Sequence, residues 1–208
     1  VYKSRVRIGS VSQTKGMSAP ILGESIVAKV TLTVTIACLY SGAVLFNNNL
    51  LFPWLEFDDF RNLLFLPAGL KLFLVMLFGW RAVLGLGLGI AAVALSEFSQ
   101  ISMSYGLLFG SASALSTKLG LELMSRLLRV GYPWTKLHWP SLCAIALVVG
   151  CLDATTIQWV MGALGIETFD NFFVETIKGC FGRVMGTFVF LAISLEVRRR
   201  LSNSPQDL

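Results

Sequence analysis

The sequence predicts an all-α fold: a polytopic transmembrane helix bundle of about six spans, with both termini on the cytoplasmic side. Composition is the first reason, because 55% of the 208 residues are hydrophobic, only 14% are charged, and the mean hydropathy is +0.72. Soluble domains carry about a quarter charged residues. The second reason is that apolar stretches of about 18 or more residues recur, which is the length an α-helix needs to cross a bilayer.

Six apolar segments supply the predicted spans. They are Ile26–Phe46, Leu63–Trp80, Ala82–Ser99, Ile101–Met124, Pro140–Leu164 and Phe172–Leu195. The connection 47–62 contains three consecutive asparagines and Pro53, a composition typical of a loop. The connection 125–139 contains two tryptophans and a tyrosine, which suit the membrane–water interface.

The second and third predicted spans are separated only by Trp80-Arg81. As a single helix, residues 63–99 would extend about 55 Å, well beyond a bilayer core of about 30 Å. A tight hairpin is therefore expected. It also brings the basic N-terminal segment, Arg81, the basic 125–139 loop and the Arg198–Arg200 triplet to one side, which the positive-inside rule assigns to the cytoplasm.

This orientation divides the chain into three parts. Residues 1–25 form a basic cytoplasmic segment, 26–197 the six-helix transmembrane domain, and 198–208 a basic cytoplasmic tail. Met17-Ser18-Ala19-Pro20 has the character of an ordinary start, so we expect Met17 to be the initiator and residues 1–16 an upstream extension.

Several function classes are disfavoured by the sequence. The net charge of +5 does not indicate a nucleic-acid partner, because the basic residues flank the spans, where they suit anionic lipid headgroups. Phosphate-binding loops, metalloprotease motifs and nucleophile elbows are missing, so neither an enzyme nor catalytic residues are expected. The four cysteines form no C-x-x-C pair and His138 is the one histidine, so neither a metal site nor a cofactor is expected.

Small residues four positions apart predict close helix packing. The glycine pairs that carry this pattern are Gly85 and Gly89, Gly106 and Gly110, and Gly182 and Gly186.

Charged residues inside the spans are the candidate functional residues, because burying a charge in hydrocarbon costs several kcal/mol. Asp153 and Arg183 lie equally far from the turn of the last hairpin, so we expect them to meet as a buried ion pair. Lys71, with Pro67 and Gly69 near the start of its helix, is expected to line the main polar cavity. Lys118 and Glu122 are spaced to pair along one helix face.

Short motifs resemble the membrane-associated sensor (MASE, first type) domains of bacteria. They are Leu66-Pro67-Ala68-Gly69, Gly79-Trp80-Arg81, the alternating glycines at 85–89, and the glycine-rich helix 179–195. The resemblance implies a small-ligand or signal-sensing module in the bacterial inner membrane, which acts through other membrane subunits or a separate signalling protein. The family usually has an acidic residue at the position of Arg183, eight spans and a cytoplasmic output domain, whereas we expect six spans and no output domain here.

Two other classes remain open. The number of spans and the glycine-rich helices are similar to those of the substrate-binding membrane components of energy-coupling-factor vitamin transporters, although only Ala37 and Ser41 approach a small-residue coupling motif. The short basic termini and abundant phenylalanine would also suit a structural or assembly subunit of a larger membrane complex.

Overall fold

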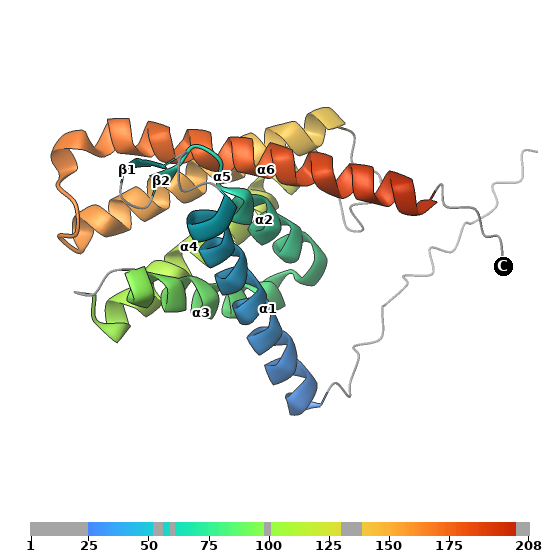
Figure 1. Cartoon of the computed structure of the whole chain (residues 1–208), viewed down its shortest axis with the longest axis horizontal. Helices are drawn as coiled ribbons and strands as arrows, with labels where there is room; N and C mark the ends of the chain where they lie inside the picture. Colours follow the sequence, from blue (N-terminus) through green and yellow to red (C-terminus); the bar gives the residue numbers. More distant parts are fainter. Residues whose placement is uncertain (1–24, 52–55, 59–60, 98–100, 130–138, 203–208) are drawn as a thin grey trace, which may run out of the picture.

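The computed structural model describes residues 25–51, 56–58, 61–97, 101–129 and 139–202 (Figure 1). The described chain is helical apart from one small ribbon. Its elements are α1 (Ile26–Phe46), continued by the short π-helix η1 (Asn47–Leu51), strands β1 (Glu56–Asp58) and β2 (Arg61–Asn62), α2 (Leu66–Phe78), α3 (Trp80–Glu97), α4 (Met103–Leu127), α5 (Trp139–Ala163), the 3₁₀ turn η4 (Phe169–Asn171) and α6 (Phe172–Ser202). The helical fold class is confirmed, and the antiparallel β1–β2 ribbon is an addition within the predicted loop 47–62.

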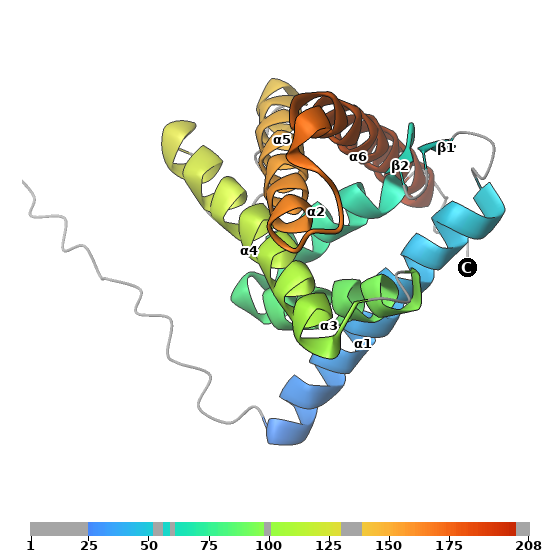
Figure 2. The same ribbon diagram turned by 90° about the vertical axis from the view of Figure 1, so that its left-hand side faces the viewer.

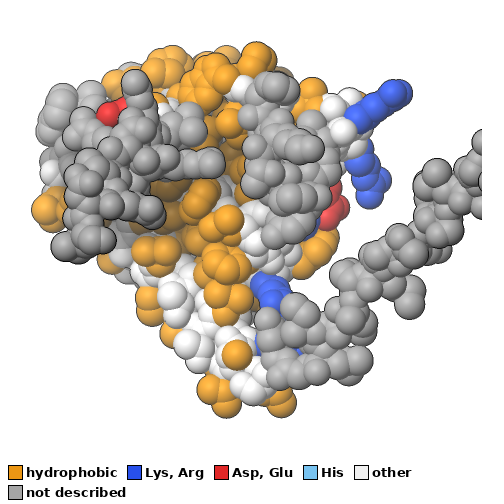
Figure 3. All heavy atoms as spheres, turned by 90° about the vertical axis from the view of Figure 1, so that its right-hand side faces the viewer, with side chains coloured by type: hydrophobic (Ala, Val, Ile, Leu, Met, Phe, Trp, Pro, Cys, Tyr) orange, Lys and Arg blue, Asp and Glu red, His pale blue; other side chains and the backbone are white. Residues whose placement is uncertain are grey.

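Among the described residues, four helical segments are long and apolar enough to cross a membrane: Ile26–Leu50, Trp80–Glu97, Trp139–Ala163 and Phe169–Ser194. Helix α2 has only 13 residues, about 20 Å of helix. Helix α4 has the length, at 25 residues, but serines and charged side chains interrupt its apolar sequence. Leu84, Trp159 and Ile177 are among many large apolar side chains that are more than half exposed, and Figure 3 shows such side chains over much of one face. This surface suits lipid better than water.

The helices pack around one apolar core. Helices α5 and α6 form a long antiparallel hairpin, α3 packs along α4, and α1 packs against α3 (Figures 1 and 2). The axis of helix α1 is steeply inclined to the axes of the α5–α6 hairpin in both views. All of the first five helices contribute side chains to this core, among them Ile36, Tyr40, Leu72, Val75, Leu86, Leu121 and Ile145.

Serine side chains cap two of the helices at their N-termini. The Ser25 hydroxyl accepts from the Ala28 N–H at 3.2 Å at the start of α1, and the Ser102 hydroxyl accepts from the Tyr105 N–H at 3.5 Å at the start of α4. Such caps satisfy N–H groups that have no partner within the helix. They explain why α4 begins slightly after the predicted Ile101.

The predicted break between the second and third spans lies at Gly79. This residue has φ +58° and ψ −131°, a backbone conformation that residues with a Cβ rarely adopt. Helix α3 begins directly after it. Trp80 and Arg81 therefore belong to α3 and do not form the turn. The two segments are separate helices, as the length argument predicted.

The start of α2 differs from the prediction. Leu63 to Phe65 lie outside the helix, and the Phe65 N–H donates to the Gly182 carbonyl of α6 at 3.1 Å. The Leu66 N–H donates to the Asn47 side-chain oxygen at 3.2 Å, so a buried residue at the end of α1 caps α2. Pro67 follows in the first turn, where its missing N–H costs nothing. The helix begins at Leu66 because its first N–H groups are satisfied from outside.

The predicted packing glycines make two kinds of contact. Gly85 and Gly89 of α3 lie against the backbone of α1, and Gly106 and Gly110 of α4 lie against α3, as expected for helix contacts. On α6, a side chain at Gly186 would collide with the carbonyl of Phe65, and Gly182 accepts the Phe65 hydrogen bond. The pair on α6 therefore contacts the non-helical segment before α2, which corrects the prediction of a helix–helix seam at these two residues.

Candidate functional site

Three charged side chains from three helices meet inside the bundle. The Asp153 carboxylate of α5 accepts at Oδ2 from Lys71 Nζ of α2 at 2.7 Å and from Arg183 Nε of α6 at 2.9 Å. The side chains of Lys71 and Asp153 are only 3% and 2% exposed, and that of Arg183 is 17% exposed. Their mutual contact compensates part of the cost of removing these charges from water.

Helix α4 completes the cluster with two serines. Ser113 and Ser116 donate to Asp153 Oδ1 at 2.8 and 3.0 Å, and Lys71 Nζ also donates to the Ser113 hydroxyl at 2.9 Å. The carboxylate thus accepts four hydrogen bonds, which uses its full accepting capacity. We refer to Lys71, Ser113, Ser116, Asp153 and Arg183 as the charge cluster.

The guanidinium of Arg183 is fixed by further contacts. Its Nη1 donates to the Gly179 carbonyl one turn earlier on α6 at 3.1 Å. Its Cζ lies 5.9 Å from the centre of the Phe65 ring, within the range of a cation–π contact. The non-helical residue that contacts Gly182 and Gly186 therefore also lies over the charge cluster, which couples the start of α2 to Arg183.

The structure brings together residues that the sequence assigned to two sites. Asp153 and Arg183 are in contact, as the hairpin register indicates. Lys71 lines the cavity, as expected, but it is also the third member of the ion-pair cluster. Ser113 and Ser116 were not predicted. Their spacing of three places both on one helix face, but that signal alone does not say which helix the face contacts.

A cavity of about 140 Å³ lies beside the charge cluster. Lys71, Asp153 and Arg183 form its charged floor. The polar side chains nearer the ends of α1, α3 and α5 and the start of α6 form a second group, which we call the acidic rim: Asn48, Glu97, Gln158, Glu167 and Glu175. Between the two groups the walls are mostly apolar or aromatic, with Tyr40, Phe65, Ile90, Phe109 and Met161 among them.

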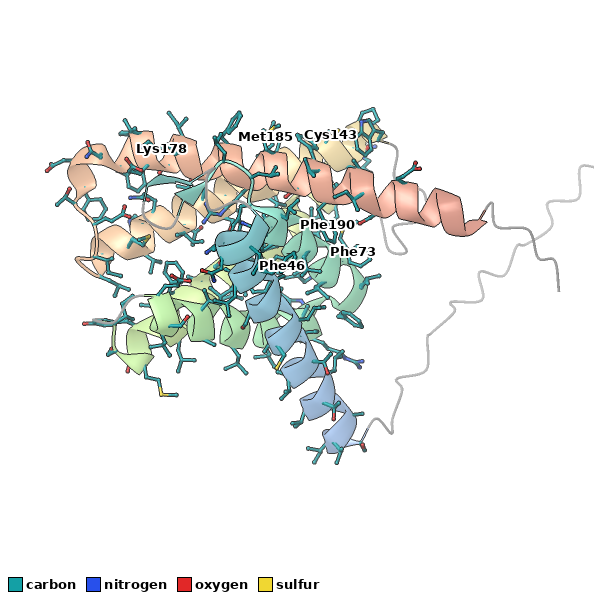
Figure 4. The ribbon with its side chains drawn as sticks, viewed as in Figure 1. Phe46, Phe73, Cys143, Lys178, Met185 and Phe190 are labelled. Carbon is teal, nitrogen blue, oxygen red and sulfur yellow. The ribbon has the colours of Figure 1, made fainter. Side chains whose placement is uncertain are left out.

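Two predicted lining residues lie elsewhere. Neither Pro67 nor Gly69 lines this cavity. Gly69 instead lies directly against Phe190 of α6, whose ring is 6.1 Å from that of Phe73 (Figure 4). Both residues precede Lys71 on α2 but lie on a face that packs against protein. The assignment of Pro67 and Gly69 to the cavity is therefore wrong, because only one face of α2 reaches it.

Two short polar contacts involve residues of the acidic rim. Gln158 Nε2 donates to Glu167 Oε2 at 2.6 Å, which ties α5 to the turn after it. Glu175 pairs with Lys178 on the first turns of α6 at 3.0 Å, and Figure 4 shows Lys178 toward the α5–α6 turn. These contacts hold carboxylates at the opposite end of the cavity from the charged floor.

Tyr40 is a further polar group at the cavity. The residue is only 3% exposed and lines the cavity, yet its hydroxyl makes no hydrogen bond within the described part of the chain. Buried tyrosine hydroxyls usually have a hydrogen-bond partner. Tyr40 therefore offers a hydrogen-bonding group to whatever occupies the cavity.

The remaining charged contacts lie nearer the surface. Lys118 pairs with Glu122 at 2.8 Å, as their spacing predicts, and its ammonium lies 5.3 Å from the centre of the Trp80 ring. Across the described ranges, no group of three or more His, Cys, Asp or Glu residues is placed to hold a metal ion. The charge cluster and its cavity are thus the main polar feature of the bundle.

Comparison with known proteins does not assign the chain to a family. No protein-family model matches the chain, and no curated protein or solved structure is significantly similar to it.

Proposed function

We propose that this chain is an integral membrane protein whose helix bundle binds a small polar solute in the cavity beside the charge cluster. The observation that carries the proposal is a cavity lined by three buried, mutually paired charges from α2, α5 and α6. Ionisable residues inside membrane bundles are costly and mark ligand or ion sites. A cluster that served packing alone would not need an adjoining cavity with an unpartnered tyrosine.

We further propose six crossings with both termini in the cytoplasm of a bacterial inner membrane. The non-helical segment Leu63–Phe65 adds about 10 Å to the 20 Å of α2, so that together they approach the 30 Å of a bilayer core. Non-helical backbone is tolerated at that depth only where protein satisfies its polar groups. The contacts of Phe65 with Gly182 and of Leu66 with Asn47 meet that condition.

The biological role that we propose for this binding is sensing. The resemblance of the α2–α3 and α6 motifs to membrane-associated sensor domains supports it, and a separate signalling protein or another membrane subunit would then carry the output. The cluster joins α2, α4, α5 and α6, so a solute that alters one of its contacts would shift helices that reach both ends of the bundle.

A transporter component is the second candidate. The observation that favours it is the short helix α2, which begins beside the cavity after a non-helical segment. Interrupted helices of this kind form the solute sites of many secondary transporters.

Access of water-soluble reagents to the cavity tests the proposed binding function. In a variant with its native cysteines replaced, Ala94→Cys introduces a thiol into the cavity wall, whereas Ala91→Cys, one turn earlier on α3, does not. Both alanines are 3% exposed, so they are matched in burial. We expect 2-aminoethyl methanethiosulfonate to modify Ala94→Cys at least about tenfold faster than Ala91→Cys in membranes, because thiol reactivity follows access. Equal rates would show that the cavity is closed to solutes.

A further inference from the structure

The charge cluster contains one negative charge too few. Lys71 and Arg183 share the single carboxylate of Asp153, so these three residues together carry a formal charge of +1. Ser113 and Ser116 complete the cluster without adding charge. An uncompensated charge inside a membrane bundle is costly, and solvent screens this one poorly because Lys71 and Asp153 are buried. One further anionic group beside Lys71 and Arg183 would make the cluster neutral.

The hydrogen-bonding groups that the cluster leaves unused are donors. Asp153 already accepts four hydrogen bonds, which is its full capacity. Lys71 uses two of its three N–H groups, one for Asp153 and one for Ser113. Arg183 uses two of its five N–H groups, one for Asp153 and one for the Gly179 carbonyl. Neither cation has another hydrogen-bond partner among the residues that the structure describes, so the cluster can bind a group that accepts hydrogen bonds and carries negative charge.

The two cations are close enough to hold one such group together. Both bond to the same oxygen of Asp153, at 2.7 and 2.9 Å, so Lys71 Nζ and Arg183 Nε are no more than about 5.6 Å apart. One carboxylate can bridge two cations at this separation when each of its oxygens accepts at about 2.8 Å. Both side chains line the cavity. The buried Tyr40 hydroxyl lines it too and has no hydrogen-bond partner in the described part of the chain, so it supplies a further donor.

The acidic rim is not part of this site. Gln158 bonds to Glu167, and Glu175 pairs with Lys178, so these groups have partners of their own. Gln158 also follows Asp153 by five residues on α5, which is about 7.5 Å along the helix. The rim carboxylates are partly exposed, whereas the charges of the floor are more deeply buried. Solvent therefore screens the rim better, and the charge of the floor acts more strongly on a ligand beside it.

Size and wall chemistry indicate an apolar body for the rest of the ligand. The volume of about 140 Å³ is close to that of an engineered protein cavity, about 150 Å³, that holds benzene. Ile90, Phe109 and Met161 offer apolar contacts. A chloride ion would leave these walls without contacts, and a second carboxylate would exceed the single missing charge. A compact hydrocarbon group with one carboxylate matches both the charge and the walls.

We propose that the cavity binds a short-chain aliphatic monocarboxylate, with its carboxylate at Lys71 and Arg183 and its hydrocarbon body against the apolar walls. This assignment rests on the proposed binding function and names the class of solute.

Four small probes test the assignment on the full chain in lipid nanodiscs, in a buffer that contains neither chloride nor carboxylates. 3-Methylbutanoate carries one charge, and 3-methylbutanamide has nearly the same shape without it. Sodium chloride supplies an anion without a hydrocarbon body, and butanedioate carries two charges. Titration calorimetry and thermal unfolding should show 3-methylbutanoate binding at least about tenfold more tightly than each other probe, because it alone matches the missing charge and the apolar walls.

The charge count is tested by Lys71→Met, which leaves Asp153 and Arg183 as a neutral pair. This variant should bind 3-methylbutanoate and 3-methylbutanamide within about threefold of each other, because no charge is left to compensate. Lys118→Met, which alters the surface pair of α4, should retain the preference of about tenfold. A preference that survives in folded Lys71→Met would overturn the assignment.

A milder variant tests the same site if Lys71→Met does not fold. Tyr40→Phe should weaken 3-methylbutanoate binding about tenfold, because it removes a donor to the carboxylate. Tyr105→Phe, at an exposed tyrosine on α4, should leave the affinity unchanged. Equal affinities in the two variants would contradict the proposed position of the carboxylate.

Contrary results with the unaltered chain separate the two proposals. If the amide binds within about threefold of the carboxylate, the cluster is neutral by itself, and the monocarboxylate assignment is wrong while the binding function stands. The assignment is equally wrong if chloride or butanedioate binds as tightly as 3-methylbutanoate, or if 3-methylbutanoate at about 10 mM produces no shift in folded protein. Cysteine access at Ala94 then decides independently whether the cavity admits solutes at all.

Discussion

Asp153 is the residue on which the charge cluster depends. It is the single anion between Lys71 and Arg183, so its replacement and that of Arg183 have unequal consequences. In an ion pair of only two residues, replacing either residue would be expected to lower the free energy of unfolding by about the same amount. Here Lys71 is a third member, so the two replacements are not equivalent.

We predict that Asp153→Asn lowers the free energy of unfolding by about 3–5 kcal/mol, because it leaves two buried cations without an anion. Arg183→Gln should cost only about 1.5–3 kcal/mol, the range for a charged hydrogen bond, because Lys71 and Asp153 still neutralise each other. Denaturant titration of the purified protein in detergent measures both.

The Lys118–Glu122 pair of α4, whose side chains are 12% and 33% exposed, supplies the control for this comparison. Glu122→Gln removes the Lys118 contact and should cost under about 1 kcal/mol. Equal losses for Asp153→Asn and Arg183→Gln would contradict the three-member cluster.

The sequence could predict the Asp153–Arg183 part of this cluster, because two residues equally far from the turn of a helical hairpin lie at the same level along its two helices. Asp153 and Arg183 are equally distant from the turn, and that relation survives small errors in the helix ends. The roles of Ser113 and Ser116 could not be predicted in the same way. They depend on the rotation of α4 about its axis and on which helices surround it, and both are decided by packing over the whole bundle.

Helix α2 is the element that departs most from a simple transmembrane span. Its first N–H group is capped by Asn47, 19 residues earlier, and its preceding residue bonds to α6. Local sequence shows Pro67 near a helix start, but a cap supplied from another element leaves no pattern next to it. The boundary was therefore predicted three residues too early.

We predict that Gly186→Ala destabilises the protein by about 1–3 kcal/mol, because a Cβ at this position collides with the backbone carbonyl of Phe65, which cannot rotate away. The matched control is Gly42→Ala on α1, where a Cβ would meet no atom within 4 Å. Thermal unfolding of both variants makes the comparison. If Gly186→Ala is as stable as Gly42→Ala, Phe65 does not lie against α6 as described.

The basic residues predict how the whole bundle is oriented in the membrane. In cells that express a variant without native cysteines, Asp58→Cys should react with an impermeant maleimide added outside the intact cells. Arg129→Cys, on the predicted cytoplasmic side after α4, should react only after permeabilisation. Labelling of Arg129→Cys alone in intact cells would reverse the topology.

Charge distribution predicts which side each connection occupies, but it contains no information about crossing angles. The steep course of α1 relative to the α5–α6 hairpin comes from its contacts with α3, where Gly85 and Gly89 let the backbones approach. Glycine spacing predicted the contact at these two residues. The angle depends on how the surrounding side chains interdigitate.

The contact between Phe65 and α6 also has a consequence for the order in which the chain assembles during synthesis. Its partner Gly182 is made roughly 120 residues later, about 6–24 s at ordinary rates of translation. Until then the backbone before α2 lacks its acceptor, and an unsatisfied N–H in hydrocarbon costs several kcal/mol. In the six-crossing arrangement that we propose, we therefore expect that helix α2 does not settle in the lipid when it is first made. We expect it to complete its insertion only when the last helix arrives, so that the nascent bundle closes from its C-terminal end.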